Sequence, residues 1–341
     1  MANKLDISQL DFDGIKDNLK TFLKQQDEFT DYDFEGSGMN ILLDVLAYNT
    51  HYLGYNANML ANEMFLDSAD QRSSVVSLAK QVGYTPRSAS SSKATIDVLV
   101  NNGSGSSITM ARGTKFTSTV DGTSYSFVNN ADVSVSPVDG VYKFSNLDIF
   151  EGTYLNFKYT ANTSDQDQRF IIPNDNVDTT TLTVKVQNSS SDSTTNTYTL
   201  AQGITGLDST SEVYFLNEVE NGRFEVYFGD GVLGKAIADG NIVILDYITC
   251  NRDEPNGATT FTLSGNVGGF TNVTITTVDN AANGDGPESI ESIKFNAPRD
   301  FTSQDRAVTA DDYKVLVKSL FANAQSVQVY GGEDAATPDY G

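Results

Sequence analysis

Residues suited to acid–base or nucleophilic chemistry are sparse in this chain. It contains one histidine, His51, and one cysteine, Cys250, among 341 residues. A serine nucleophile needs a general base, and a zinc site needs several histidine or cysteine ligands, so neither site can be assembled in its usual form. His51 falls inside a long helical pattern, where a packed or surface role is expected. The lone cysteine excludes an internal disulfide.

Glycine-rich and acidic turns are the next candidates for a ligand site. Residues 229–235 read Gly-Asp-Gly-Val-Leu-Gly-Lys, which lacks the spacing of a phosphate-binding loop and carries an acid where phosphate would lie. Residues 11–14, 229–231 and 283–286 offer oxygen atoms near tight turns, as a calcium site would. None contains a twelve-residue loop with a closing acid, and turn formation explains all three. No metal, cofactor or catalytic residue is predicted.

The charge is the strongest feature of the composition. Forty-five acids against 22 bases give a formal net charge of −23 and a pI near 4.2. Such a surface repels nucleic acid phosphate and anionic membranes. No run of eighteen apolar residues exists, and the N-terminus is polar, so neither a membrane span nor a secretory signal is expected. The acids are scattered along the chain, so they are expected to form a solubilising surface, and basic partners stay open.

The stretch 36–86 organises the rest of the chain, because it predicts two helices that cannot bury themselves alone. Ser37 is suited to cap the first helix, Asp67 or Ser68 the second, and Gly83 ends the second. The apolar residues at helical spacing in the first helix are Ile41, Leu42, Val45, Leu46, Leu53 and Leu60. The pattern predicts a helical hairpin that needs another surface to lie on.

A polar line runs beside these apolar residues, with Asn49, Asn56 and Glu63 recurring every seven positions. One interpretation is a solvated face whose neighbouring tyrosines cover the edge of the core. The other is a row of polar groups that sets register against a partner helix, as in coiled coils. Under the second interpretation, the candidate interface residues are Leu42, Leu46, Asn49, Leu53, Asn56, Leu60 and Glu63.

The remaining sequence predicts an α+β protein in which the helical hairpin precedes several mostly antiparallel β domains and a small C-terminal α/β part. A short amphipathic helix is expected from about Ile15 to Gln26. After Pro86 the apolar residues alternate, with turn residues about every ten positions. Helices return after Pro287, with an expected stop at Ala297-Pro298 and a capped helix after Thr309. Residues 326–330 are expected to form a strand.

The predicted division of the chain follows these changes of pattern. Residues 1–89 form the helical region, and residues 90–160 the first β domain. Residues 161–211 are a polar β insertion, and residues 212–286 a second β region. Residues 287–341 form the C-terminal helix–strand part, which is expected to continue beyond Gly341.

Three stretches of the chain resemble one known family. The first comprises Gly36-Ser37, Leu42-Leu43-Asp44, Asn49-Thr50, Glu63-Met64-Phe65-Leu66 and Gly83-Tyr84-Thr85-Pro86. The second comprises Phe228-Gly229-Asp230-Gly231-Val232-Leu233-Gly234, Asp239-Gly240-Asn241 and Asn256-Gly257. The third comprises Glu291, Lys294, Ala297-Pro298, Phe301, Gln304, Arg306-Ala307-Val308-Thr309 and Asp312-Tyr313. In this order they resemble the baseplate J-like family, the large baseplate wedge proteins of contractile-tailed bacteriophages.

The resemblance implies a structural, non-enzymatic protein of the virion tail baseplate, made in the host cytoplasm. It implies that two copies pair with another wedge subunit through a helical bundle. It also implies contacts with neighbouring wedges and with the tail hub or a sheath-initiating protein. Wedges would join into a ring around the hub and couple host engagement to sheath contraction. No cofactor, nucleic acid or membrane is implied.

Two other classes of function stay open at this stage. Scattered acids and many short strands are compatible with a calcium-stiffened β-rich adhesin or a tail-associated polysaccharide-binding protein. A two-carboxylate polysaccharide hydrolase is a third hypothesis, because acids are plentiful and a sequence contains no distances. The absence of tryptophan disfavours a sugar-stacking cleft.

Overall fold

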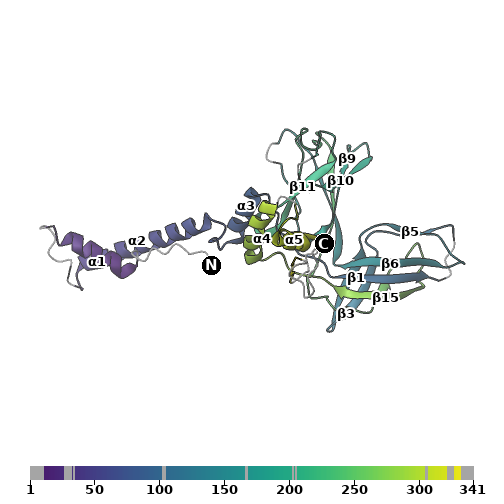
Figure 1. The fold of residues 1–341 in the computed structure, drawn as a ribbon, viewed down its shortest axis with the longest axis horizontal. Helices are drawn as coiled ribbons and strands as arrows, with labels where there is room; N and C mark the ends of the chain where they lie inside the picture. The colour runs from purple at the N-terminus through teal and green to yellow at the C-terminus, as the bar shows by residue number, and fades with distance from the viewer. Residues whose placement is uncertain are drawn as a thin grey trace.

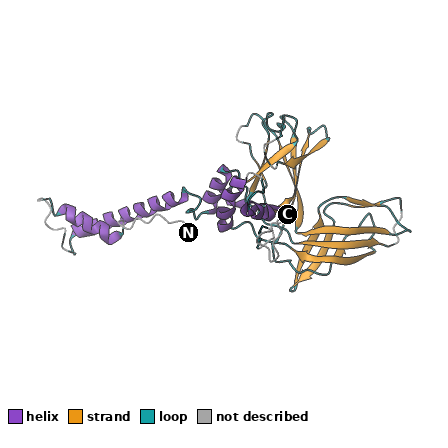
Figure 2. Cartoon of the chain, viewed as in Figure 1, coloured by secondary structure: helices purple, strands orange, loops and turns teal. Residues whose placement is uncertain are grey.

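The computed structural model describes residues 11–26, 33, 35–101, 105–165, 168–201, 203, 206–303, 306–320 and 326–331. A helical arm projects from a body made of two β-sheet regions and a cluster of short helices (Figure 1). Helices lie at the arm and at its junction with the body, and strands fill the two ends of the body (Figure 2). The predicted fold class, an N-terminal helical region followed by mostly antiparallel sheets and a small C-terminal helical part, is confirmed.

The helical hairpin is formed by α1 (Phe12–Leu23) and α2 (Gly38–Glu63), which pack against each other in the arm. The pairing expected within residues 36–86 is wrong, because α3 (Arg72–Gln81) packs instead against α4 (Ile290–Ser303) in the body. A small apolar core explains this pairing, since Val75 and Ala79 of α3 are buried with Ile293 and Ala297 of α4.

The helix ends follow local rules. Ser37 caps α2 as predicted, its hydroxyl accepting from the Asn40 N–H at 3.0 Å. Gly83 takes a φ of +83° just after α3, a left-handed conformation that glycine adopts without strain. However, α3 begins at Arg72 and not next to Asp67 or Ser68. The connection between α2 and α3 is therefore longer than the sequence predicts.

The first sheet has six strands in the order β14-β3-β4-β6-β1-β15. Its strands are β1 (Lys93–Val100), β3 (Lys115–Val120), β4 (Thr123–Asn129), β6 (Tyr142–Glu151), β14 (Thr262–Ser264) and β15 (Val273–Ala282). β2 (Ile108–Met110) and β5 (Val133–Val135) form a small separate pair. Residues alternate between buried and half-buried along all of β1, so one face of that strand packs on the core around Phe116, Phe127 and Phe144.

The second sheet has seven strands in the order β7-β13-β9-β10-β11-β12-β8. Its strands are β7 (Thr153–Thr160), β8 (Phe170–Ile171), β9 (Val177–Gln187), β10 (Thr195–Leu200), β11 (Val213–Glu218), β12 (Phe224–Phe228) and β13 (Ile242–Thr249). A one-turn 3-10 helix, η1 (Glu220–Gly222), joins β11 to β12. Only β10 and β11 pair in parallel among the described strands. The core includes Val184, Val226 and Leu245.

The chain completes the second sheet before it finishes the first. It leaves the first sheet after β6, builds β7 to β13, and returns with β14 and β15 to the two edges of the first sheet. The strands of the segments 90–160 and 212–286 are thus shared between both sheets. The linear domain division stays a prediction, since strand grouping alone does not define independently folding units.

A buried polar cluster ties the two sheets together. Arg112, from the loop before β3, lies 3.4 Å from the carboxylate of Asp246 on β13 and also donates to the Thr181 carbonyl of β9. Asp246 further accepts from Tyr154 and Asn156 at 2.8 and 2.5 Å. Burial raises the pKa of Asp246, but these donors together with Arg112 outweigh burial and hold it below its usual value. The cluster favours a fixed angle between the sheets.

The C-terminal part differs from the prediction at two points. Pro298 was expected to end a helix, but α4 runs through it to Ser303. Burial of Ile293 and Ala297 against α3 compensates for the backbone hydrogen bond that a proline lacks. The capped helix is confirmed as α5 (Ala310–Leu320), whose Thr309 and Asp312 exchange side-chain-to-backbone hydrogen bonds. The strand expected at 326–330 is wrong, because residues 326–331 pair with no described strand.

Candidate assembly interface on the helical arm

The two arm helices differ greatly in length. The 26 residues of α2 span about 39 Å and the 12 residues of α1 about 18 Å, at the usual rise of an α-helix. An ion pair of 2.5 Å between Lys16 and Asp44 fixes α1 beside the first half of α2. The buried residues of α2 are Asn40, Leu43 and Ala47, all within this half. The second half of α2 extends beyond the end of α1.

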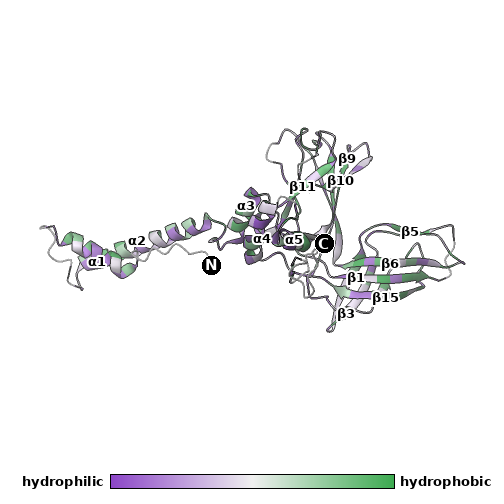
Figure 3. Cartoon of the chain, viewed as in Figure 1, coloured by the Kyte–Doolittle hydropathy of each residue, from purple (hydrophilic) through white to green (hydrophobic). Residues whose placement is uncertain are grey.

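The four predicted interface leucines are all exposed. Leu53 and Leu60 expose 60% and 64% of their surface, and Leu42 and Leu46 expose more than half. Further exposed apolar residues on α2 are Ile41, Val45, Tyr48, Tyr52, Tyr55 and Met59. Figure 3 shows hydrophobic residues interspersed with hydrophilic ones along the helices of the arm. Large exposed apolar patches are typical of interaction sites.

The polar line lies in the middle of this apolar face, because a helix turns 100° per residue. Leu53 lies roughly 60° to one side of Asn56, and Met59 lies roughly 60° to the other side. Asn49 has the same flanks, and both asparagines are exposed. Amides enclosed by apolar rows on both sides match the arrangement that sets register and partner number in helical bundles.

Glu63, the last predicted interface residue, also has a role within the chain. Its carboxylate accepts from the backbone N–H groups of Asp70 at 2.9 Å and Gln71 at 3.3 Å, directly before α3. Burial raises the pKa of Glu63, but these hydrogen bonds and one from Ser74 lower it further than burial raises it. Glu63 thereby joins the end of the arm to the first helix of the body, a role that no spacing rule reveals.

The acidic turns considered for a ligand site each make hydrogen bonds or an ion pair within the chain. Asp11 caps α1 by accepting from the Gly14 N–H at 2.8 Å. Asp230 accepts from two backbone N–H groups of its own loop at 2.9 Å, and Asp285 pairs with Arg87 at 2.7 Å. These contacts agree with the turn interpretation. No group of three or more His, Cys, Asp or Glu side chains gathers as a metal site within the described part of the chain.

The buried carboxylates of the body are likewise occupied. Glu218 pairs with Arg72 at 2.7 Å, and Glu288 accepts from the Tyr84 hydroxyl at 2.8 Å. Glu151 accepts from the Asn251 side chain at 2.7 Å, although burial raises its pKa. Each carboxylate therefore already stabilises a junction between elements. None of the described helices is both long and apolar enough to cross a lipid bilayer.

Comparisons with known proteins agree with this geometry. Residues 11–84 match the family model "Baseplate wedge protein gp6-like, helical domain". Residues 156–256 match "Bacteriophage baseplate wedge protein gp6, third domain". Residues 309–341 match "Baseplate structural protein gp6, C-terminal domain I". The first match covers α1 to α3, and the second covers most of the second sheet, so the matches follow structural elements.

One curated relative extends the similarity to nearly the whole chain. The baseplate wedge protein gp6 of Enterobacteria phage T4 is 31% identical over 363 aligned residues, which cover 96% of this chain. The alignment covers 52% of that relative, so the chain spans about half its length. Three related family models in chain order, together with this alignment, show that the chain belongs to the gp6-like family of bacteriophage baseplate wedge proteins.

Proposed function

We propose that this chain is a structural, non-enzymatic component of a baseplate wedge in a contractile phage tail, located in the virion baseplate. Family membership supports the structural role, and the exposed apolar face of α2 carries the proposal for how the chain assembles. Removing apolar surface from water stabilises a complex by about 25 cal/mol per Å². A face carrying ten exposed large apolar residues on one helix therefore favours association strongly once a complementary helix covers it.

The proposed contact is a helical bundle built on α2. Its partners are other wedge subunits and a second copy of this chain, with the leucine rows packed inside. Asn49 and Asn56 would meet polar groups of a partner helix and so select one register. The amides lie within an apolar face, where a slip of one turn would leave them opposite leucines and without hydrogen bonds. The arm thus supplies the affinity and its polar line the specificity.

The body has a different proposed role. Its two sheets, joined through Arg112 and Asp246, would act as a rigid spacer between the bundle and neighbouring wedges. In this proposal wedges close into a ring around the tail hub and transmit host engagement to the sheath. Supporting observations are the long arm, whose far end lies away from the body (Figure 1), and the hydrogen bonds by which Glu63 joins the end of α2 to the start of α3.

Co-expression with the neighbouring wedge subunits tests the assembly role. The wild-type chain is expected to elute with them as one complex of defined stoichiometry in size-exclusion chromatography with light scattering. The double variant Leu46→Glu with Leu53→Glu is expected to remain unassembled while its circular dichroism spectrum stays unchanged, because both side chains are exposed in the isolated chain. Assembly of this variant, or a wild-type chain that stays monomeric beside every neighbour, would contradict the proposal.

A control that adds a single charge lies on the same helix and is compared with Leu53→Glu alone. His51 is separated from Leu53 by roughly 160° around the helix axis, so His51→Glu adds a charge at the same level on the opposite side. This variant is expected to assemble like the wild type. A loss of assembly equal to that of the leucine variants would show that any charge on α2 is disruptive, and that the leucine face has no special role.

A second pair of variants tests the register role. Asn49→Leu and Asn56→Leu are expected to keep or raise the stability of the complex while broadening its stoichiometry, because apolar layers pack in several registers. Light scattering measures the distribution of masses. Complexes of the wild-type mass alone would exclude a register role for the asparagines.

A further inference from the structure

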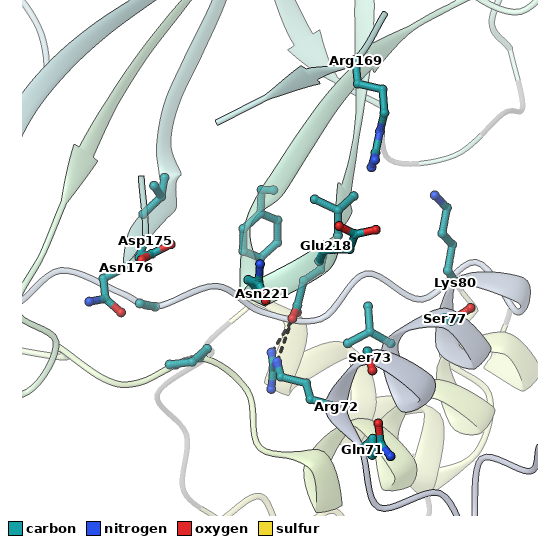
Figure 4. Close-up of a pocket in the computed structure, with 18 of the residues that line it drawn as sticks. Gln71, Arg72, Ser73, Ser77, Lys80, Arg169, Asp175, Asn176, Glu218 and Asn221 are labelled. Atoms are coloured by element: carbon teal, nitrogen blue, oxygen red, sulfur yellow. Dashed lines mark hydrogen bonds and ion pairs between the residues drawn. The ribbon is translucent and has the colours of Figure 1, made fainter. Parts of the chain in front are cut away.

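A cleft of about 940 Å³ lies at the root of the arm, between α3 and the second sheet. One wall is formed by α3, with Ser73, Ser77 and Lys80, and the other by the start of β8 and the β11–β12 connection (Figure 4). The segment after β13 contributes Arg252. This cleft is separate from the apolar face of α2 and takes no part in the proposed bundle.

Two of the three acids that line the cleft have partners within the chain. Arg72 and Glu218 form a two-fold ion pair at 2.7 and 2.8 Å, in which the Glu218 side chain is 1% exposed. Asp175 lies 3.3 Å from Arg223. The third acid, Glu220, is the first residue of η1 and contributes to raising the pKa of Arg169, after the stronger effect of Glu225. Arginines of the chain itself thus balance two of the three lining carboxylates.

Two bases of the cleft have no such balance. Most described lysines and arginines lie within 4.0 Å of a carboxylate, as expected in a chain with twice as many acids as bases. Lys80 and Arg252 have no carboxylate at this distance among the described residues. Lys80 lies 3.2 Å from the side-chain amide of Asn217, whose oxygen accepts from Lys80 once the amide is turned over, and Arg252 donates to the amide oxygen of Asn176 at 3.1 Å.

The backbone at Arg252 is a further unusual feature. Its φ of +62° lies in the left-handed region, where a Cβ crowds the neighbouring backbone. Asparagine tolerates this region, as Asn176 and Asn221 do in the same cleft, but arginine does so rarely. Such outliers persist where the surrounding structure holds them, and they concentrate at binding sites.

Positive groups therefore converge on the cleft from separate elements. Figure 4 shows the Lys80 amine and the Arg169 guanidinium pointing toward each other from opposite walls. Arg169 holds the Glu225 carboxylate through two hydrogen bonds of 3.0 and 2.9 Å. Apolar side chains of Val76, Val177 and Phe224 complete the lining. The lining therefore contains bases that can pair with carboxylates, together with apolar side chains.

We propose that this cleft binds an extended acidic segment of a partner protein, with its carboxylates on Lys80 and Arg252. A nucleic acid is disfavoured, because its regularly spaced phosphates would continue along a surface of strongly negative net charge. A protein segment can place one or two carboxylates in the cleft and remain neutral on either side. Charges beyond about 8 Å are screened at physiological salt, so the local bases decide binding.

Fluorescence anisotropy with the full-length chain tests this site. The probe is a rhodamine-labelled short peptide of alternating glutamate and serine, and the reference is the same peptide with glutamine in place of glutamate. The glutamate peptide is expected to bind at low salt and to weaken as salt is added. Lys80→Glu with Arg252→Glu is expected to weaken binding by about tenfold or more, because each change replaces attraction by repulsion.

A matched control has the same change of charge outside the cleft. Lys115 and Lys158 are exposed bases of β3 and β7 without a carboxylate within 4.0 Å among the described residues. Lys115→Glu with Lys158→Glu is expected to leave binding within about twofold of the wild type, because those charges lie outside the cleft. Lys80→Glu alone covers the case in which the Arg252 change disturbs folding, since Lys80 is exposed on α3.

Three outcomes would overturn the proposal. They are equal binding of the two peptides, an equal loss in the control variant, and displacement of the peptide by inorganic phosphate at similar concentration. The last would assign the cleft to a small anion. The Leu46→Glu, Leu53→Glu variant is expected to bind the peptide like the wild type. Failure of the bundle proposal and failure of the cleft proposal are therefore measured separately.

Discussion

The helices α2 and α3 are neighbours in sequence and have opposite surroundings. Both carry apolar residues at helical spacing, but α3 buries Val75, Val76 and Ala79 against α4, whereas the outer face of α2 is exposed. A pattern of apolar residues specifies which side of a helix needs cover, without specifying who provides it. In α3 the cover comes from a segment some 200 residues later in the chain. For α2 we infer that it comes from another subunit.

Removing Arg72 should give the largest effect, because it breaks the junction where α3 meets the second sheet. Arg72→Ala leaves the buried carboxylate of Glu218 without its partner and is expected to destabilise the chain by about 3–5 kcal/mol. Arg72 also donates to the Glu288 carbonyl before α4. Urea denaturation followed by circular dichroism measures the change. A loss below about 1 kcal/mol would show that the junction is held by apolar contacts alone.

Truncating a buried side chain of the α3–α4 contact should give the next largest effect. Ile293 is fully buried between α4 and α3, and Ile293→Ala is expected to cost about 2–5 kcal/mol through lost contacts and a residual cavity. Hydrogen exchange of the α3 and α4 amides follows the local loss. Unchanged protection in both helices would contradict the description of this pair as a core.

The connection between the two regions should show a smaller effect that depends on pH. Glu63→Ala removes an acceptor from the start of α3 and is expected to cost about 1 kcal/mol at neutral pH. The pKa of Glu63 is lowered in the folded chain, so its contribution is complete above the unfolded value of about 4.3 and is lost as pH falls through the folded value.

Thermal melts of the wild type and of the Glu63 variant over acidic pH test this linkage. The difference between them should shrink as pH falls below the unfolded value. Glu63→Gln retains an amide oxygen as acceptor but does not titrate. As pH falls, its difference in melting temperature from the wild type should vanish before that of Glu63→Ala. A difference that stays constant down to the lowest pH would exclude the carboxylate as its source.

The uncovered side should give the smallest effect in the isolated chain. Leu53→Ala is expected to change stability by less than about 0.5 kcal/mol, because the side chain is already exposed and alanine favours helices. The same substitution is expected to weaken the assembled complex clearly in co-purification. A cost of about 2 kcal/mol or more in the isolated chain would mean that α2 packs on its own body.

Local patterns predicted most of the elements. Alternation located β1, β6, β12 and β13, and helical spacing with the Ser37 cap located α2. The exchange of hydrogen bonds between Thr309 and Asp312 at the start of α5 was also readable, because it needs only residues three apart. The stop at Pro298 was wrong because burial of a neighbouring helix face overcame a local rule.

The candidate sites were predicted unequally. The leucine and asparagine rows of α2 follow from spacing, and the structure shows these residues exposed while their partner stays a proposal. The cap formed by Glu63 and the cleft at Lys80 and Arg252 could not be predicted. Each depends on groups that only folding brings together. Lys80 of α3 and Arg252 line the same cleft, although about 170 positions separate them in the sequence.

The sequence by itself determined most of the helices and strands, the strong negative charge and the family, because these depend on residue type and on spacing within a few positions. Only the tertiary structure decided that α3 pairs with α4, that the second sheet interrupts the first, and that the outer face of α2 is exposed. The hydrophobic effect favours burial of apolar surface but has no preferred direction. The shape of the whole folded chain therefore selects which surfaces meet.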